Sequence, residues 1–291
     1  MSTQITTAFV QQYSSNVSML AQQMGSRLRS SVDVETINGK FAFFDQIGVT
    51  AAQVRSTRHG NTPQINTPHS RRRVGLADYE WADLIDDQDK VRLLVDPTSN
   101  YAKAAAAAMG RSMDDVVIAA FNASADTDET GSTAVALPST SKFSTADQAD
   151  GLTIAKLLSA KEFFDGGDVD PSIPRYFVCG SKQIQDLLGT TQVTSSDFNT
   201  VKALASGDVD TFLGFKFILS NRLPMDGTNT DDRLCFAYTQ DAVKLAVGKD
   251  ITAKIDVRPD KSYATQVYTC MSIGATRMEE EKIVSIAAHE A

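Results

Sequence analysis

A run of five alanines lies inside the stretch that most constrains this fold. The stretch reads VDPTSNYAKAAAAAMGRSMDDVVIAAFNAS and covers residues 95–124. Asp96 can cap a helix, Pro97 suits the first helical position, and alanine has the highest helix propensity. Large apolar residues recur at every fourth position: Met109, Met113, Val117 and Phe121. The pattern predicts a helix over about 97–123, with one apolar face against a sheet and a small alanine face open to close approach.

The residues before this helix have a different pattern, which is typical of β-strands. Two β-prone pieces, FAFFDQIGV (41–49) and RRRVGLADYEW (71–81), flank the polar segment RHGNTPQINTPHS. They predict a long pair of β-strands that extends from the body of the protein and ends in an irregular polar loop. The opening segment has an amphipathic helical pattern over 9–28, whose stripe would pack on its own body or on a neighbouring subunit. That stripe consists of Phe9, Tyr13, Val17, Leu20, Met24 and Leu28.

After the helix, the chain alternates helical and strand patterns. A helix is expected from a cap at Asp150 to a stop at Gly166, then a strand in RYFVCG, a short helix over 181–189 and a strand in GFKFILSN. This order suggests an α/β subdomain spanning 146–230. The C-terminal part reads as β, most clearly in ITAKIDVRP, where apolar and polar residues alternate.

Charge is divided unevenly along the chain. Residues 1–76 have 8 basic and 3 acidic side chains (+5), and residues 77–291 have 20 and 33 (−13), which together give the net charge of −8. Every Lys or Arg between Lys40 and Lys90 is an arginine, whose planar guanidinium is favoured where carboxylates are bound in a protein interface. Aromatic residues are not interleaved with these arginines, which disfavours a nucleic-acid groove. A protein interface is therefore predicted for Arg55, Arg58, Arg71, Arg72 and Arg73, with a solvated face as the alternative.

No catalytic or metal-binding motif is found. The chain has no GxSxG elbow, P-loop, GxGxxG, CxxC or HExxH. The acidic pairs 86/87, 114/115 and 231/232 are interpreted as solvated faces and helix caps, and Cys179, Cys235 and Cys270 as buried thiols. No apolar run is long enough to span a bilayer, and the N-terminus lacks a signal-peptide pattern. We expect no catalytic, cofactor or metal site, no membrane, and a cytoplasmic protein.

Four stretches carry a resemblance to a known family. They are QQMGSRLRSSV (22–32), TRHGNTPQINTPHSRRRV (57–74), the long stretch from YEWADLIDD to DDVVIAAF (79–121) and GFKFILSNRLP (214–224). Together with the order of features, they resemble the major capsid proteins of tailed phages, which have the Hong Kong 97 (HK97) fold. The likeness extends over essentially the whole chain.

The resemblance implies an α+β capsid fold in five parts. Residues 1–40 would be an N-terminal arm, 41–90 the extended β-hairpin or E-loop, 91–145 the peripheral domain with its spine helix, 146–230 the axial domain, and 231–291 the C-terminal β part of the peripheral domain. The implied function is self-assembly into pentamers and hexamers of an icosahedral virion head that encloses double-stranded DNA and is built in the host cytoplasm. The E-loop arginines would bind a neighbouring copy, with Trp81 as an apolar anchor.

Some properties of the founding family member are not expected here. Its covalent cross-link needs a lysine on the E-loop, and this chain has none between Phe41 and Asp89. About 40 residues before the E-loop are too few for a fused scaffolding domain, so scaffolding would be separate or absent. A portal and a decoration protein are further possible partners, and DNA would be packaged without sequence-specific binding. An encapsulin-like shell and a soluble α/β enzyme remain the alternatives.

Overall fold

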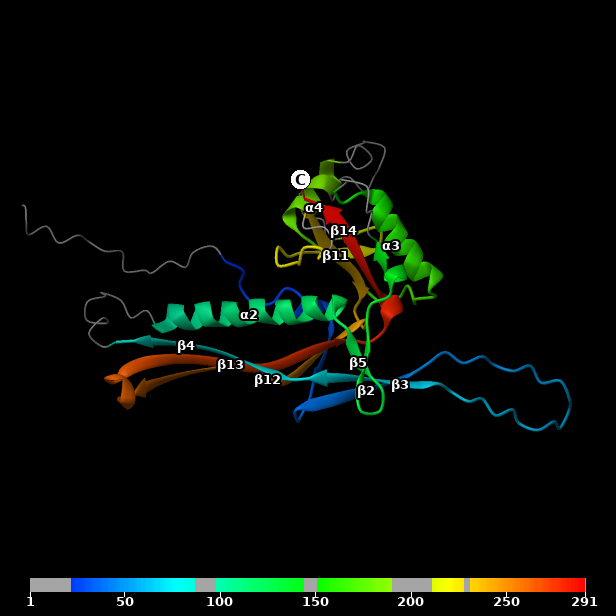
Figure 1. Cartoon of the computed structure of the whole chain (residues 1–291), viewed down its shortest axis with the longest axis horizontal. Helices are drawn as coiled ribbons and strands as arrows, with labels where there is room; N and C mark the ends of the chain where they lie inside the picture. Colours follow the sequence, from blue (N-terminus) through cyan, green and yellow to red (C-terminus); the bar gives the residue numbers. More distant parts are fainter. Residues whose placement is uncertain (1–21, 87–97, 144–150, 190–210, 228–230, 291) are drawn as a thin grey trace, which may run out of the picture. The chain divides into compact units, whose positions relative to one another are not determined.

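The computed structural model describes residues 22–86, 98–143, 151–189, 211–227 and 231–290. The chain divides into two compact units, each of which is described by itself. Unit 1 comprises Met1–Ser26, Asp78–Arg111 and Lys249–Met271, and unit 2 comprises Arg27–Ala77, Ser112–Gly248 and Ser272–Ala291. The long elements α2 (Thr98–Asn122), β12 (Val243–Arg258) and β13 (Ala264–Arg277) contribute residues to both units (Figure 1).

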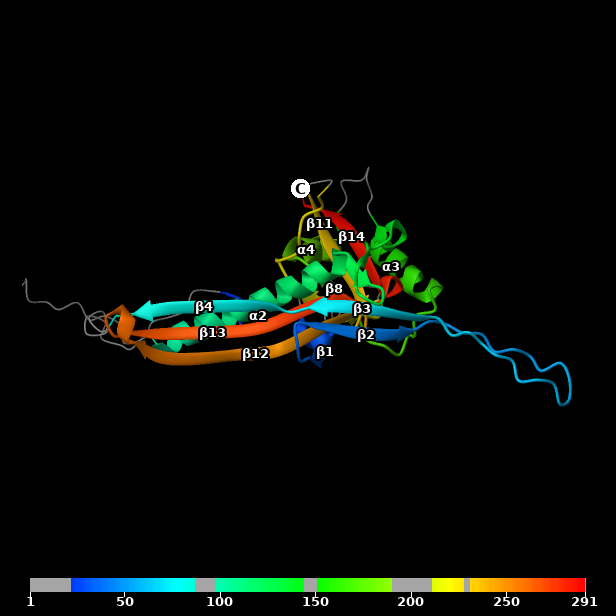
Figure 2. The same cartoon turned by 60° about the horizontal axis from the view of Figure 1, so that its bottom comes forward.

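Unit 1 combines the first part of α2 with a β-ribbon. Strand β4 (Ala77–Ile85) lies beside β13, and β13 lies beside β12 (Figure 2). The sheet has the order β1-β12-β13-β4, and its first strand, β1 (Asp33–Thr36), belongs to unit 2. The turn η4 (Pro259–Lys261) joins β12 to β13. The predicted helix is confirmed, although its expected cap and first position, Asp96 and Pro97, lie outside the described residues. The backbone of Gly25 approaches α2 closely at Gly110, where a Cβ would clash with it, whereas the predicted close approach to the alanine face stays a prediction.

Unit 2 contains a six-stranded sheet with the order β7-β14-β11-β8-β10-β9. The predicted strand, helix and strand are β8 (Arg175–Cys179), α4 (Ser181–Gly189) and β10 (Phe215–Leu219), and the two strands are parallel. Strand β8 also pairs with β11 (Asp232–Thr239), which pairs with β14 (Ile283–His289). These pairings connect residues on both sides of position 230, where the sequence suggested a boundary. The sheet is completed by β7 (Lys142–Phe143) and β9 (Thr211–Phe212).

Helix α3 (Ile154–Gly166) belongs to the same unit and differs slightly from expectation at its start. Thr153 is the N-cap, and its hydroxyl accepts a hydrogen bond from the Lys156 amide. The expected cap Asp150 lies outside the described residues and is too far upstream for a helix that begins at Ile154. Gly166 is the last helical residue, as predicted, and Gly167 follows as the C-cap.

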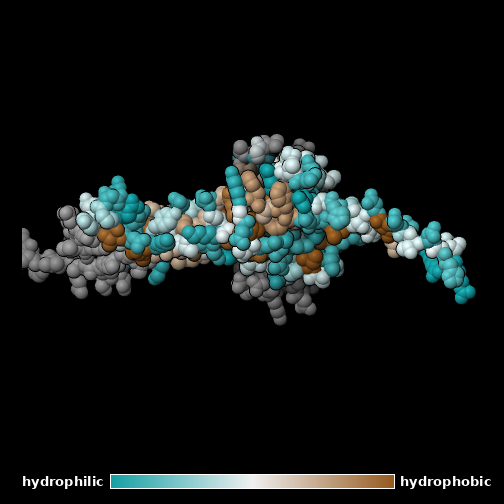
Figure 3. All heavy atoms as spheres, turned by 90° about the horizontal axis from the view of Figure 1, so that it is seen from below, coloured by the Kyte–Doolittle hydropathy of each residue, from teal (hydrophilic) through white to brown (hydrophobic). Residues whose placement is uncertain are grey.

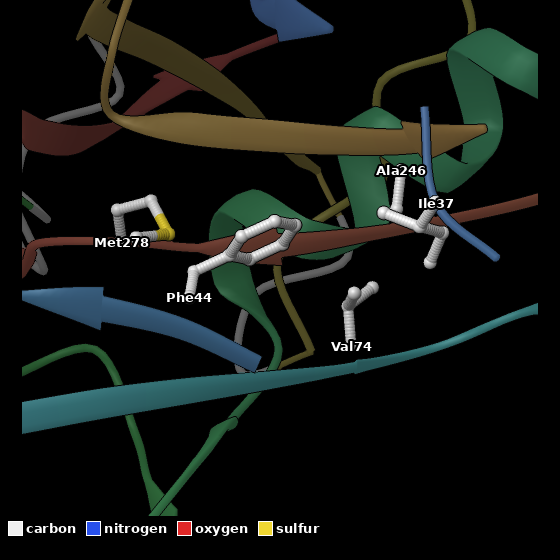
Figure 4. Packing of buried hydrophobic residues seen from close by; sticks show 5 residues of the cluster. All are labelled: Ile37, Phe44, Val74, Ala246 and Met278. Carbon is white, nitrogen blue, oxygen red and sulfur yellow. The ribbon is translucent and has the colours of Figure 1, made fainter. Parts of the chain in front are cut away.

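A second sheet of unit 2, with the order β2-β3-β5-β6, contains the predicted hairpin. Its strands are β2 (Phe41–Ile47), β3 (His69–Gly75), β5 (Ala125–Thr127) and β6 (Thr133–Val135). The two-stranded part therefore ends at Gly75, and the chain continues into β4 of the other sheet. Phe44 of β2 and Val74 of β3 pack in one apolar cluster with Ile37, Ala246 and Met278 (Figure 4). This cluster fixes the base of the hairpin.

The prediction that the N-terminal helix extends to residue 28 is wrong. Residues 1–21 lie outside the described part, but residues 22–28 are not helical, and Gly25 has φ of 75°. The short helix η2 (Arg29–Ser31) and strand β1 (Asp33–Thr36) follow. The backbone amides of Arg27 and Leu28 instead donate to the Asp114 carboxylate at 3.1 Å. A local apolar pattern could not predict this long-range contact.

Asp114 also corrects the interpretation of the acidic pairs. It is fully buried on α2, whereas solvent exposure was expected from the sequence. Its neighbour Asp115 is partly exposed and forms an ion pair with Arg222. No helix among the described residues is long and apolar enough to cross a membrane.

Candidate subunit interface

The β2–β3 hairpin places the three consecutive arginines on two different faces. Phe44 lies opposite Arg72, and Asp45 lies opposite Arg71, in an antiparallel register. Because side chains alternate along a strand, Arg72 points to the same side as Val74, toward the core. Arg71 and Arg73 point to the other side. One uninterrupted basic run in the sequence is thus separated into a buried residue and two partly exposed ones.

Arg72 is 7% exposed and binds groups at the end of β13. Its Nε donates to the Met278 carbonyl at 2.9 Å, and its Nη2 donates to both Glu280 carboxylate oxygens at 2.8 Å. A buried guanidinium needs such a partner, because an unpaired buried charge is strongly destabilising. Arg72 therefore holds the base of the hairpin to the rest of unit 2.

Glu280 serves a second buried arginine, Arg277. This side chain is 1% exposed and donates to the carbonyl oxygens of Phe121, Ala123 and Val135 at 2.7–3.3 Å. The first two carbonyls lie at the C-terminal end of α2, where backbone acceptors have no partner within the helix. Burial lowers the pKa of the Arg277 guanidinium, and the nearby Glu280 carboxylate opposes this shift. One glutamate thus connects the hairpin base to the end of the spine helix.

Arg71 and Arg73 have partners on the outer face of the same sheet. Arg71 Nε donates to Asp45 at 2.6 Å, and the hydrogen bond holds the pKa of the Asp45 carboxyl below its usual value. Arg73 pairs with Asp126 of β5 at 2.8 Å. Both guanidiniums also lie over phenylalanine rings of β2, at 5.3 Å for Arg71 and 5.0 Å for Arg73. These cation–π contacts add to the attraction between β2 and β3.

The predicted interface residues therefore differ in their burial and in their partners. Arg71, Arg72 and Arg73 have carboxylate partners within their own chain, which the sequence interpretation did not foresee. Arg55 and Arg58 lie on the exposed connection 48–68, which we call the loop tip. Arg55 donates only to the Thr57 carbonyl, at 3.0 Å, and no carboxylate pairs with either arginine among the described residues. Trp81, on β4 of unit 1, is half-buried.

A groove of about 760 Å³ opens beside the root of the hairpin. Its walls come from the hairpin root, the C-terminal end of α3 and the segment that follows β13. We call it the acidic groove, because its charged lining is Arg72 and four glutamates: Glu162, Glu279, Glu280 and Glu281. Phe163 and Met278 add apolar surface.

The thiols are not all alike. Cys179 and Cys235 are fully buried, as predicted, and burial raises the pKa of Cys179 to about 12. Cys270, on β13, is only half-buried, which corrects the expectation for this residue. Its Sγ accepts from Lys249 Nζ at 3.2 Å, and hydrogen bonds from Thr252 and Lys249 lower its pKa. Across the part of the chain that is described, no His, Cys, Asp and Glu cluster has a metal-binding arrangement.

The sequence interpretation missed the structural roles of three residues: Asp114, Arg277 and Glu280. Each acts over a long sequence separation, so no local motif marks it. A weak signal existed for Arg277, because an arginine at the end of the strand pattern YATQVYTCMSIGATR is followed by EEE, which offers it a carboxylate.

Comparison with known proteins identifies the family. The family model for phage capsid proteins matches residues 5–290. The chain belongs to the phage capsid protein family. Its fold is the HK97-like α+β capsid fold that the sequence predicted. The predicted function as a major capsid protein is also confirmed. No curated protein sequence matches the chain.

Solved capsids share the fold of this capsid protein at low sequence identity. The capsid of Cyanophage P-SCSP1u has a TM-score of 0.77 at 18% identity, over 100% of this chain and 96% of that one. The capsid of Ralstonia phage GP4 has 0.74 at 10% identity, over 98% and 96%. The Cyanophage Pam1 capsid asymmetric unit has 0.71 at 14% identity, over 98% of both chains.

Proposed function

We propose that many copies of this protein assemble into pentamers and hexamers of an icosahedral phage head that encloses double-stranded DNA. Each subunit contributes the same two surfaces, one on either side, in heterologous contacts that close because the rotation between neighbours closes the ring. The protein acts by assembly and catalyses no reaction. Assembly takes place in the host cytoplasm, and DNA is enclosed without sequence-specific binding.

The single observation that supports this proposal is the exposed hairpin. Its strands are fixed to unit 2 by the apolar cluster and by Arg72, yet the connection beyond them has no strand partner among the described residues. Val49 and Val54 on this connection are 97% and 95% exposed. Burial of such a side chain contributes about 1.5–3 kcal/mol, so a protein surface that covers the connection is strongly favoured. A neighbouring copy is the surface available in a capsid.

The other predicted partners remain part of the proposal. A separate scaffolding protein, a portal and a decoration protein are the natural companions of a capsid subunit. An encapsulin-like compartment is the alternative for the same fold, but the family match to phage capsid proteins favours a virion. The interface role of Trp81 on β4 is also proposed, as a half-buried aromatic that a neighbour can cover.

Assembly can be tested directly. The chain is expressed in bacteria, together with the scaffolding protein of its phage where one is encoded, and sedimented fractions are viewed by negative-stain electron microscopy. Closed shells with five-fold and six-fold rings are expected. A stable monomer under all these conditions would contradict the proposal.

A further inference from the structure

The loop tip (residues 48–68) carries positive charge and no negative charge. Arg55, Arg58 and His59 lie on it, and it contains no Asp or Glu. Apart from Thr67, every residue of the loop tip is exposed. In Figure 3, the arm at the right shows brown patches near its base and ends in hydrophilic, teal atoms. The loop tip thus offers two guanidiniums without counter-charges on a mostly polar end.

The acidic groove has the opposite charge, and only two of its four glutamates are paired with a cation among the described residues. Glu279 pairs with Lys282, and Glu280 pairs with Arg72 and Arg277. Glu162 and Glu281 are exposed and form no ion pair with any residue that the structure describes. Two carboxylates at the groove are therefore available to bind cations.

The end of α3 adds to the negative potential of the groove. Glu162, Phe163, Gly166 and Gly167 all line it, and they lie in the last turn of the helix or just after it. The C-terminal end of a helix carries a partial negative charge, and the last turn of α3 has no basic residue to offset it. Guanidiniums are favoured at such a place because they can donate to carboxylates and carbonyls together.

The arginines of the loop tip do not line the groove of their own chain. Gly48 and Val49, the first two residues of the loop tip, are part of its lining, whereas Arg55 and Arg58 are not. Figures 1 and 2 both show the connection between β2 and β3 leading away from the sheet. A hairpin connection of this length can reach roughly 30 Å from its root, far enough to cross onto an adjoining molecule. Each copy thus presents a cationic projection at one place and an acidic recess at another.

We propose that the loop tip of one copy docks in the acidic groove of the next, with Arg55 and Arg58 against Glu162 and Glu281. This inference rests on the proposed assembly function and names the acceptor surface of the contact. The contact is heterologous, since two different surfaces of the same chain are joined, and its repetition around a ring leaves no groove empty. Phe163 and Met278 in the groove supply apolar surface for Val54 of the loop tip.

Charge exchange tests the inference. The variants are R55E/R58E, E162R/E281R and the combination of all four substitutions, with K161E as a control one position outside the groove on α3. Because the four residues are exposed and form no ion pair within the described part of the chain, each variant should keep the melting temperature of the unchanged subunit. Shell yield is measured by sedimentation and negative-stain microscopy under the conditions in which the unchanged chain assembles.

Each double variant should lower the shell yield by about tenfold or more, which requires a loss of only ~1.4 kcal/mol of association free energy. The fourfold variant should recover most of the yield, and K161E should retain it. Normal yield from either double variant, or no recovery in the fourfold variant, would overturn the inference while the proposed function stands. A loss confined to E162R/E281R would mean that another segment occupies the groove. If the unchanged chain never forms shells, the proposed function fails, and the inference fails with it.

Discussion

Replacement of Glu280 by glutamine tests how the hairpin is attached. The carboxylate accepts both hydrogen bonds of Arg72 Nη2 at 2.8 Å and a longer one from Arg277 at 3.4 Å. Glutamine keeps one acceptor oxygen, but its amide group would face a guanidinium N–H, donor against donor. Two arginines that are 7% and 1% exposed would then lose their shared counter-charge.

The loss of stability in Glu280→Gln depends on how deeply the ion pair is buried and on the hydrogen bonds that the two arginines keep. Breaking a buried ion pair costs about 3–5 kcal/mol. The lower end applies here, because the Glu280 side chain is 22% exposed and both arginines keep hydrogen bonds to backbone carbonyls. We expect Glu280→Gln to lower the free energy of unfolding by ~3 kcal/mol.

Urea unfolding of the purified subunit, followed by circular dichroism, measures this change. Glu281→Gln is the matched control, since it removes the same charge one residue later from an exposed side chain that pairs with no described cation. It should change the free energy of unfolding by no more than about 0.5 kcal/mol. Hydrogen exchange should also become faster at the amides of β2 and β3 in Glu280→Gln. Equal stabilities of the two variants would refute the attachment of the hairpin through this carboxylate.

Three further predictions follow from the same contacts. Arg72→Ala should destabilise the subunit by about 3 kcal/mol or more, because it leaves the Met278 carbonyl without this donor and Glu280 with only the longer contact to Arg277. Arg71→Ala should destabilise it much less, because the ion pair of Arg71 is exposed, and urea titrations of both variants decide this. Cys270 should react with a thiol reagent in the folded protein, while Cys179 and Cys235 stay protected, so one rapidly labelled thiol per chain is expected and three would contradict the burial pattern. Lys249→Ala should shift the rise in the labelling rate of Cys270 to higher pH, because the Lys249 ammonium favours the thiolate. Mature shells should run as single subunits on a reducing denaturing gel, since no lysine occurs between positions 41 and 89, and a covalent ladder would disprove this.

The sequence predicted the parts of this fold that depend on local pattern. The alanine run and its four-residue apolar repeat predicted α2, and alternating residues predicted the ribbon strand β12. The hairpin was also expected, although its end at Gly75 was not. In each case, the residues that decide the conformation are near neighbours in the chain.

Contacts between distant residues could not be predicted in this way. The turn at Gly25 replaces a helix because Asp114, on α2, accepts backbone N–H groups of residues 27 and 28. The arginine run gave no sign that one member would be buried, because only the pairing register and the position of Glu280 decide which face is covered. The partial exposure of Cys270 was also missed, because its apolar neighbours in the sequence suggested a core residue.

The central claim is that the exposed hairpin of this capsid protein contacts an adjoining copy. An electron cryomicroscopy map of its assembled shells tests the claim most directly. We predict that residues 50–68 lie on the neighbouring subunit, with the guanidiniums of Arg55 and Arg58 within about 4 Å of its carboxylates. A map in which these residues touch only their own chain or solvent would contradict the account.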